Sequence, residues 1–321
     1  MARPQRLLAL ALAAPLLLSA CSGGDDGAAA TGADGDSLSF AVVTHGSAGD
    51  AFWDVVQNGA VQAGEDLGID VDYQSDGDPQ RQSQLIEAAV NQDVDGIVVS
   101  MANPDALQSA VEDAAAAGIP VVTINSGAAE SVEFGAIGHV GQDETIAGLG
   151  AGQRLAADGR TNVLCVVHEA GNIGLEQRCD GASQGLGTDV TTLQVDINDL
   201  QAAQSTITSS LQSDPSIDAV LTLNSAVAAV AATAATDAGS EAEIATFDLN
   251  SDVIAGIQDG SISFAVDQQQ YEQGYLPIVM LQLYAQNLNT VGGGQPVLTG
   301  PGIVDADNVD AIAELASSGT R

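Results

Sequence analysis

The sequence contains no lysine, and its seven arginines face 43 aspartates and glutamates, which gives a formal net charge of −36. A nucleic-acid-binding surface needs clustered basic side chains, and this composition supplies none, so partners of that class are excluded. The same negative field disfavours anionic membranes and strongly anionic ligands. Aromatic residues are scarce at 3%, but the hydrophobic share of 45% is too high for a disordered chain. The 321 residues therefore predict an acidic, folded protein of about two domains.

Cysteine is also scarce, and its spacing excludes the common metal motifs. The three cysteines form no CxxC pair, and the three histidines are scattered along the chain. We therefore expect neither a metal nor another cofactor. If Cys21 is modified after export, Cys165 and Cys179 remain in an oxidising compartment, and one disulfide between them is the economical interpretation. Two buried free thiols are the alternative.

The longest apolar run near the N-terminus, residues 7–18, is too short to span a bilayer. It follows two arginines and leads into Leu18-Ser19-Ala20-Cys21, which resembles the bacterial lipobox. That resemblance implies a signal peptide over residues 1–20 and a lipid on Cys21, which would anchor the exported protein at the outer face of the cytoplasmic membrane. An ordinary secretory signal with an incidental cysteine is the alternative. Residues 21–37 have hardly an apolar side chain and predict a flexible tether.

From residue 38 onward, short β-rich runs alternate with amphipathic segments. Several of the runs, such as residues 96–99, are continuously apolar, which is typical of parallel strands covered on both faces. The alternation predicts an α/β fold with doubly wound parallel sheets. The expected strands are 39–44, 69–73, 96–100, 120–124, 162–167, 190–195, 219–223, 243–247 and 263–266. The expected helices are 51–67, 80–92, 104–117, 145–157, 175–185, 200–213, 226–238 and 251–258.

Two strand segments recur at one spacing along the chain. Residues 95–100 resemble residues 218–223, and residues 120–125 resemble residues 243–248, both at a spacing of 123. Equal spacings predict two similar α/β lobes, although any two βα units look somewhat alike. Ligands of open parallel sheets bind at the carboxyl ends of the strands, and two facing sheets form a cleft there.

The residues that follow the expected strands are rich in amides, carboxylates and aromatic rings. Such side chains bind the hydroxyls of a sugar or polyol in directional pairs. A pyranose ring also needs a flat apolar partner, and we expect Phe52 or Trp53 to supply it, unless these rings pack into the core. The candidate ligand-binding residues are His45, Asp50, Phe52, Trp53, Asn103, Asn125, His168, Glu169, Asn172, Arg178, Asn224, Asp248 and Gln268.

Several of these segments together resemble a known family over residues 38–287. They are His45-Gly46 with Asp50-Ala51-Phe52-Trp53, Val94-Asp95-Gly96-Ile97-Val98-Val99-Ser100, Gly118-Ile119-Pro120-Val121-Val122, Gly141-Gln142-Asp143, Arg178-Cys179-Asp180-Gly181 and Asp267-Gln268-Gln269-Gln270-Tyr271-Glu272-Gln273-Gly274-Tyr275. In their order and spacing they are similar to the periplasmic sugar-binding proteins of the ribose/galactose type, the solute receptors of ABC importers.

The resemblance implies a receptor, not an enzyme, that binds a neutral sugar or polyol without a cofactor, closes its lobes around it and delivers it to a membrane permease. The protein would be a monomer that contacts the membrane through its lipid anchor only. The first lobe would comprise residues 38–141 plus 269–292, and the second residues 142–268 plus 293–321. Three crossings near residues 141–143, 267–269 and 292–300 would join them, and the helix around residues 272–288 would return to the first lobe.

The same resemblance assigns sugar contacts to Phe52, Trp53, Arg178, Asn224, Asp248 and Gln268. Ribose-type receptors carry Asp-Arg where this chain has Asn125-Ser126, which puts ribose itself in doubt. Arg178 would donate to ligand hydroxyls or form a structural ion pair across the cleft, with Asp248, Asp50 and Glu169 around it.

Other functions fit a cleft of this kind. A sensor partnered with a membrane histidine kinase would share the fold. A glycoside-processing enzyme would use a carboxylate pair from among Asp50, Glu169, Asp248 and Asp267, but the sequence contains no nucleophile elbow, P-loop or GxGxxG motif. A repressor core is excluded by the lipobox and by the lack of a basic helix-turn-helix.

Overall fold

The computed structural model describes residues 37–47 and 49–321. The predicted signal peptide, the lipidation site Cys21 and all of the predicted tether except Ser37 lie outside these ranges. Within them the chain forms two six-stranded sheets, with helices between successive strands. The predicted α/β fold with two similar parallel sheets is therefore confirmed. None of the described helices combines the length and the hydropathy needed to cross a bilayer.

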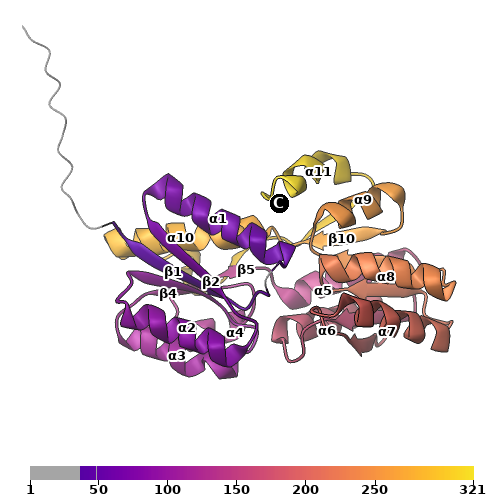
Figure 1. Ribbon diagram of the computed structural model, residues 1–321, viewed down its shortest axis with the longest axis horizontal. Helices are drawn as coiled ribbons and strands as arrows, with labels where there is room; N and C mark the ends of the chain where they lie inside the picture. Colours follow the sequence, from indigo (N-terminus) through magenta and orange to yellow (C-terminus); the bar gives the residue numbers. More distant parts are fainter. Residues whose placement is uncertain (1–36, 48) are drawn as a thin grey trace, which may run out of the picture. The chain divides into compact units, whose positions relative to one another are not determined.

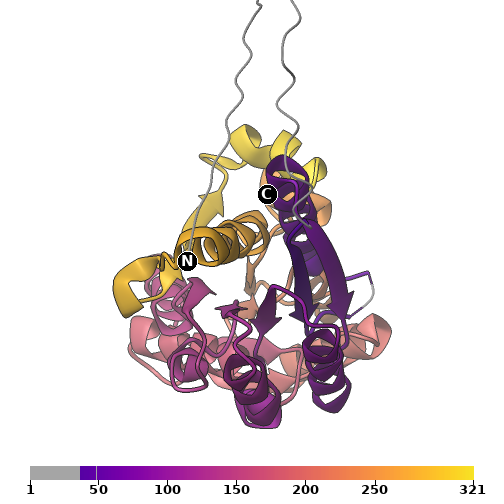
Figure 2. The same cartoon turned by 90° about the vertical axis from the view of Figure 1, so that its left-hand side faces the viewer.

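The first lobe, meaning the first sheet and the helices packed on it, has the strand order β11-β5-β4-β3-β1-β2, and its pairs are parallel. Alternate β1 side chains face opposite layers: Phe40 and Val42 contact α1 and α10, and Ala41 and Val43 contact α2 and α3. Figure 2 shows these helices on the two faces of the sheet. The elements are β1 (Ser39–Thr44), α1 (Ala51–Leu67), β2 (Asp70–Ser75), α2 (Pro79–Asn91), β3 (Gly96–Ser100), α3 (Pro104–Ala116), β4 (Val121–Ile124), α4 (Ala128–Ser131), β5 (Gly138–Gly141), α10 (Gln270–Asn287), η1 (Gly292–Gly294) and β11 (Val297–Leu298).

The second lobe is built in the same way, in the order β12-β10-β9-β8-β6-β7, with β12 antiparallel. Strands β3 and β8 hold equivalent places in their sheets, as do β4 and β9, so the recurrence at a spacing of 123 is a structural repeat. Helices α5 and α6 cover one face, and α7, α8 and α9 cover the other (Figure 1). The elements are α5 (Glu144–Ala157), β6 (Val163–Val167), α6 (Ile173–Leu186), β7 (Thr191–Gln194), α7 (Leu200–Ser213), β8 (Ala219–Thr222), α8 (Ser225–Ala238), β9 (Glu243–Phe247), α9 (Ser251–Asp259), β10 (Phe264–Asp267), β12 (Gly302–Asp305) and α11 (Val309–Ser317).

The described chain passes between the two sheets three times: from β5 to α5, from β10 to α10, and from β11 to β12. Helix α10 packs against α1 of the first lobe (Figure 1). One predicted boundary needs a correction, because β11 lies beyond residue 293 yet pairs with β5 of the first sheet, with Val297 opposite Val140. A two-residue strand after a run of glycines has too little apolar pattern to be recognised from the sequence.

A disulfide joins Cys165 in β6 to Cys179 in α6, with 6.0 Å between the Cα atoms. It ties the second sheet to α6, the helix that contains Arg178 and is capped at its N-terminus by Asn172. The two cysteines are 14 residues apart. In the chain-entropy model, closing a loop of this length stabilises a protein by about 3 kcal/mol.

Glycines allow α5 and α6 to approach each other closely. A Cβ atom placed on Gly148 would lie 2.2 Å from the backbone oxygen of Arg178, whereas one placed on Gly150 of the same helix would meet nothing within 4 Å. We expect Gly148→Ala to lower the free energy of unfolding by about 1–3 kcal/mol, because the helices must move apart. The control Gly150→Ala should raise it by about 0.5–1 kcal/mol, because alanine favours the helix. Urea denaturation measures both, and equal effects would contradict this account of the packing.

Candidate functional site

Side chains from both lobes meet at the carboxyl ends of the two sheets, as the sequence predicts. They surround a small cavity of about 30 Å³. We call this space the inner cavity. Its lining is His45, Asp50, Phe52, Trp53, Asn125, Ser126, His168, Glu169, Asn172, Leu175, Arg178, Leu223, Asn224, Asp248 and Gln268.

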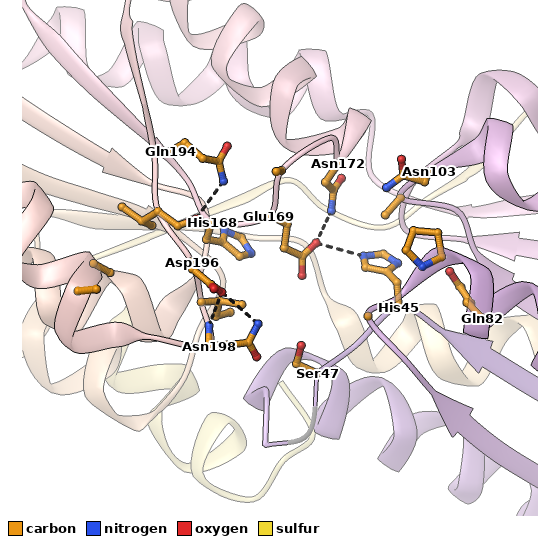
Figure 3. A pocket seen from close by; sticks show the side chains of 18 of the residues that line it. His45, Ser47, Gln82, Asn103, His168, Glu169, Asn172, Gln194, Asp196 and Asn198 are labelled. Carbon is orange, nitrogen blue, oxygen red and sulfur yellow. Dashed lines mark hydrogen bonds and ion pairs between the residues drawn. The ribbon is translucent and has the colours of Figure 1, made fainter.

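Twelve of the thirteen candidate ligand-binding residues line the inner cavity, and Asn103 does not. Asn103 instead lines a second space, the outer cavity, which shares His45, His168, Glu169 and Asn172 with the lining of the first. The outer cavity has a volume of about 660 Å³. Figure 3 shows side chains of both lobes facing each other across it. Its lining is His45, Ser47, Gly77, Pro79, Gln82, Ala102, Asn103, His168, Glu169, Ala170, Asn172, Gln194, Val195, Asp196, Ile197, Asn198, Ala202, Ala203 and Thr206.

Three inner-cavity residues cap the helices that follow the strands. The side chain of Asp50 accepts from the backbone N–H of Phe52 at 3.0 Å, that of Asn172 from Gly174 at 3.0 Å, and that of Asn224 from Ala226 at 2.8 Å. An N-cap uses one side-chain oxygen to satisfy a free backbone donor of the helix. The second polar atom of each side chain is thereby held at the end of the sheet, where a ligand can reach it.

Asn125 and Asp248 occupy equivalent positions directly after β4 and β9. Both adopt the left-handed backbone conformation, with φ of 61° and 69°. Non-glycine residues seldom adopt this conformation, and asparagine and aspartate tolerate it best. The same turn in each lobe therefore directs one polar side chain into the inner cavity.

An amide network connects these turns to the crossings between the lobes. Asn125 Nδ2 donates to the Oε1 atoms of Gln268 and Gln273, at 3.2 and 3.3 Å. Gln268 Nε2 donates to Asp248 Oδ1 at 2.6 Å, and Gln273 Nε2 donates to Thr299 Oγ1 at 3.1 Å. These contacts join the first lobe to the second and third crossings, so a ligand that contacts Asn125, Asp248 or Gln268 touches the hinge directly.

Arg178 forms its ion pair with Glu144, and not with the carboxylates predicted around it. Its Nη2 donates to Glu144 Oε1 at 2.9 Å, its Nε also donates to Glu144, and its guanidinium lies over the Phe247 ring, 4.7 Å from the centroid. Arg178 is 3% exposed and Glu144 5%. The pair lies between α5 and α6 within the second lobe, and not across the cleft as predicted. Arg178 still lines the inner cavity beside Leu223, whose carbonyl accepts from Nη1 at 3.4 Å.

Two carboxyl groups that line the inner cavity from opposite lobes have raised pKa values. Burial raises the pKa of Asp248 to about 7, against the opposing charge of Arg178. Burial likewise raises the pKa of Asp50 to about 6, against the hydrogen bond from the Phe52 N–H. Hydrogen bonds donated to a carboxylate favour its ionised form. A ligand hydroxyl that donates to either acid would therefore shift that acid toward its ionised form.

The two aromatic candidates serve both the core and the cavity. Phe52 and Trp53 belong to the core cluster beneath α1 and also line the inner cavity. Their rings meet edge to face with 4.9 Å between centroids, and Trp53 meets His45 in the same way at 4.6 Å. Each ring is thus fixed by its neighbours. Packing into the core and lining the cleft, the two alternatives that the sequence left open for Phe52 and Trp53, are therefore compatible with each other.

Beside these rings, the lobes make a direct polar contact. His45 Nε2 of the first lobe lies 3.9 Å from Glu169 Oε2 of the second, and Asn172 Nδ2 donates to the same oxygen at 2.7 Å (Figure 3). His45 Nδ1 is hydrogen-bonded to Ser100 Oγ at 2.7 Å, which fixes the ring.

The sequence did not indicate Glu144, Gln273 or Thr299. Glu144 follows β5, a Gly-His-Val-Gly segment with no recognisable strand pattern. Because the sequence does not mark β5 as a strand, it does not mark Glu144 as a residue at a strand end. Gln273 and Thr299 join the network from α10 and from the third crossing, which no local pattern connects to the cleft.

Comparison with known proteins gives one family match and several relatives. The profile of the periplasmic binding protein domain matches residues 40–289. The xylose/arabinose-binding protein of Sulfolobus acidocaldarius is 27% identical over 62% of this chain and 54% of its own length. The ribose import binding protein of Bacillus subtilis is 28% identical over 63% of this chain and 66% of its own length. The match thus spans about half to two thirds of these curated relatives.

One solved structure is considerably more similar in sequence. A carbohydrate transporter from Acidothermus cellulolyticus, crystallised in complex with myo-inositol, is 44% identical and superposes with a TM-score of 0.87. The comparison covers 89% of this chain and 100% of that one.

Proposed function

The chain belongs to the periplasmic binding protein family, as its motifs predicted, and on this premise we propose that it is the extracytoplasmic substrate-binding lipoprotein of an ABC importer. It binds a neutral sugar or polyol in the inner cavity and delivers it to a membrane permease when the lobes close. The observation that carries the proposal is that polar side chains at the strand ends of both sheets, with two fixed aromatic rings, surround one small cavity.

The charges of the inner cavity support a neutral ligand. Among the residues that line it, Arg178 is the sole arginine, and its charge is balanced by Glu144. Asp50, Glu169 and Asp248 also line the cavity, so a phosphate or a carboxylate would find no uncompensated positive charge. The 44% identical relative was solved with myo-inositol, a neutral cyclic polyol, which supports this ligand class.

The three crossings support delivery by closure. Hinge closure in two-lobed folds buries the ligand between the lobes, and the closed state is what a partner selects. Asn125 and Gln268 line the cavity and bond to each other across the hinge, so a ligand bound to them favours one lobe arrangement. The lipobox-like Leu18-Ser19-Ala20-Cys21 supports a lipid anchor that keeps the receptor beside its permease.

The test is a calorimetric titration of the purified full-length protein with myo-inositol, D-ribose, D-xylose, D-arabinose, D-glucose and D-galactose. We expect at least one of these neutral compounds to bind with a dissociation constant of about 1 μM or lower, which corresponds to about 8 kcal/mol. The phosphate esters of the same compounds are the matched controls and should not bind. Small-angle scattering should show a smaller radius of gyration with the bound ligand. Tighter binding of the phosphates, or no binding across the panel, would contradict the proposal.

A further inference from the structure

The outer cavity has most of the free space of the cleft but no part in the function proposed above. Its volume is about 660 Å³, against about 30 Å³ for the inner cavity. The two share His45, His168, Glu169 and Asn172, so a ligand in the inner cavity would have the outer one directly beside it. A single sugar ring would occupy the first and leave the second to water.

The lining of the outer cavity has the mixed character that a sugar ring needs. Polar groups face each other from the two lobes, with Ser47, Gln82 and Asn103 on one side and Gln194 and Asn198 on the other (Figure 3). A ring has apolar C–H surface as well as hydroxyls, and the same lining includes apolar side chains. These are Ala102, Ala170, Val195, Ile197, Ala202 and Ala203.

The charges of the outer cavity restrict what it accepts. Glu169 and Asp196 line it, and no arginine is among its lining residues in the described ranges. Burial lowers the pKa of His168 to about 4, so this histidine adds no positive charge near neutral pH. A phosphate or carboxylate substituent would meet only negative charge there, whereas a neutral substituent with hydroxyls would not be repelled.

Two polar side chains of the lining, one of them buried, can bond to a ligand. Asn103 stands at the N-cap position of α3, yet its side chain makes no capping bond, in contrast to the caps at Asp50, Asn172 and Asn224. His168, which is 6% exposed and belongs to both cavities, has its Nδ1 atom unpaired within the described chain. An unpaired buried polar atom costs free energy until a partner arrives. A ligand that extends from one cavity into the other can supply partners to both.

We propose that the outer cavity is a second sugar subsite, and that the preferred ligand is a neutral glycoside with one ring in each cavity. The proposal rests on the proposed function, since the first ring takes the place assigned there to a single sugar or polyol. The second ring binds in the outer cavity, between Asn103 of the first lobe and Asn198 of the second.

The test compares each ring with its glycosides by calorimetric titration of the full-length protein. The probes are myo-inositol with galactinol, D-xylose with xylobiose, D-arabinose with arabinobiose, D-glucose with maltose and cellobiose, and D-galactose with melibiose. We expect at least one glycoside to bind ten-fold or more tightly than its parent ring. We expect Asn103→Ala to reduce that advantage by roughly 2- to 12-fold, the effect of one neutral hydrogen bond, and to leave the parent ring unaffected.

A blocking variant tests where the second ring lies. Ala202 is exposed on the first turn of α7 and lines the outer cavity but not the inner one. Ala202→Trp should fill the outer cavity and abolish the advantage of the glycoside, with binding of the parent ring retained. The matched control Gln201→Trp changes the neighbouring exposed residue of the same helix, which lines neither cavity, and should retain the advantage.

The outcomes separate this proposal from the one on which it rests. If single rings bind but no glycoside binds more tightly than its parent ring, the second subsite is wrong and the proposed sugar-binding function is unaffected. The same holds if Ala202→Trp leaves the higher affinity of a glycoside unchanged. If neither rings nor glycosides bind, both proposals fail together.

Discussion

Replacement of Arg178 by alanine is expected to lower the free energy of unfolding by about 3–5 kcal/mol, because it leaves the carboxylate of Glu144 buried without a counter-charge. Glu144 is 5% exposed and receives two hydrogen bonds from Arg178. The loss of the Phe247 contact adds to the effect. Chemical denaturation of the purified protein measures the change.

The matched control is Arg154→Ala. Arg154 pairs with Asp158 and Asp305, but its side chain is 33% exposed, and solvent-exposed ion pairs contribute about 0–1 kcal/mol. Equal losses in the two variants would show that the burial of the Arg178 pair does not matter for stability.

The structural role of Arg178 is separable from its role toward the ligand. The double variant Arg178→Met with Glu144→Gln removes both buried charges, and we expect it to regain most of the lost stability, since exchanging a buried ion pair for neutral groups of similar volume is often close to neutral. It should not regain sugar affinity, because the guanidinium that lines the inner cavity is gone. Full affinity in a stable double variant would remove Arg178 from the ligand site.

Asp248→Asn is expected to weaken sugar binding by about 10- to 150-fold, the equivalent of about 1.5–3 kcal/mol for a hydrogen bond to a charged group. In the free protein burial raises the pKa of Asp248 to about 7, so between about pH 4 and 7 the folded state holds a proton that the unfolded state releases. Through this group the free protein becomes less stable as the pH rises through that range. A ligand hydroxyl that donates to the carboxylate favours the ionised form and lowers this pKa.

Two measurable consequences follow. Sugar affinity should rise with pH between about 5 and 7.5 and then level off, and binding at pH 6–7 should release up to about one proton per ligand at this site. Calorimetry in buffers of different ionisation enthalpy measures the release. The exposed residue Asp252 supplies the control, because Asp252→Asn should keep both the affinity and the proton release. Proton uptake on binding would reverse the sign and refute the role given to Asp248.

The sequence by itself determined the fold class, the order of the long elements and most of the site. Continuous apolar runs such as that of β3 identify buried parallel strands, and helices such as α1 show their apolar face in the spacing of their residues. Residues at the carboxyl ends of parallel strands line the cleft, so the cavity-lining residues His45, Asn125, Asn224 and Asp248 can be found from strand ends alone. These are local patterns, and all the residues that form such a pattern are neighbours in the sequence.

Only the tertiary structure decided which residues are partners. The pairing of Glu144 with Arg178 depends on how closely α5 and α6 approach, which their glycines allow. The place of β11 in the first sheet depends on the third crossing, and the division of the cleft into two cavities, with Asn103 in the outer one, depends on how the lobes face each other. Each is a contact between segments far apart in the chain. Such a contact is fixed by the packing of whole layers, and no short stretch of sequence contains it.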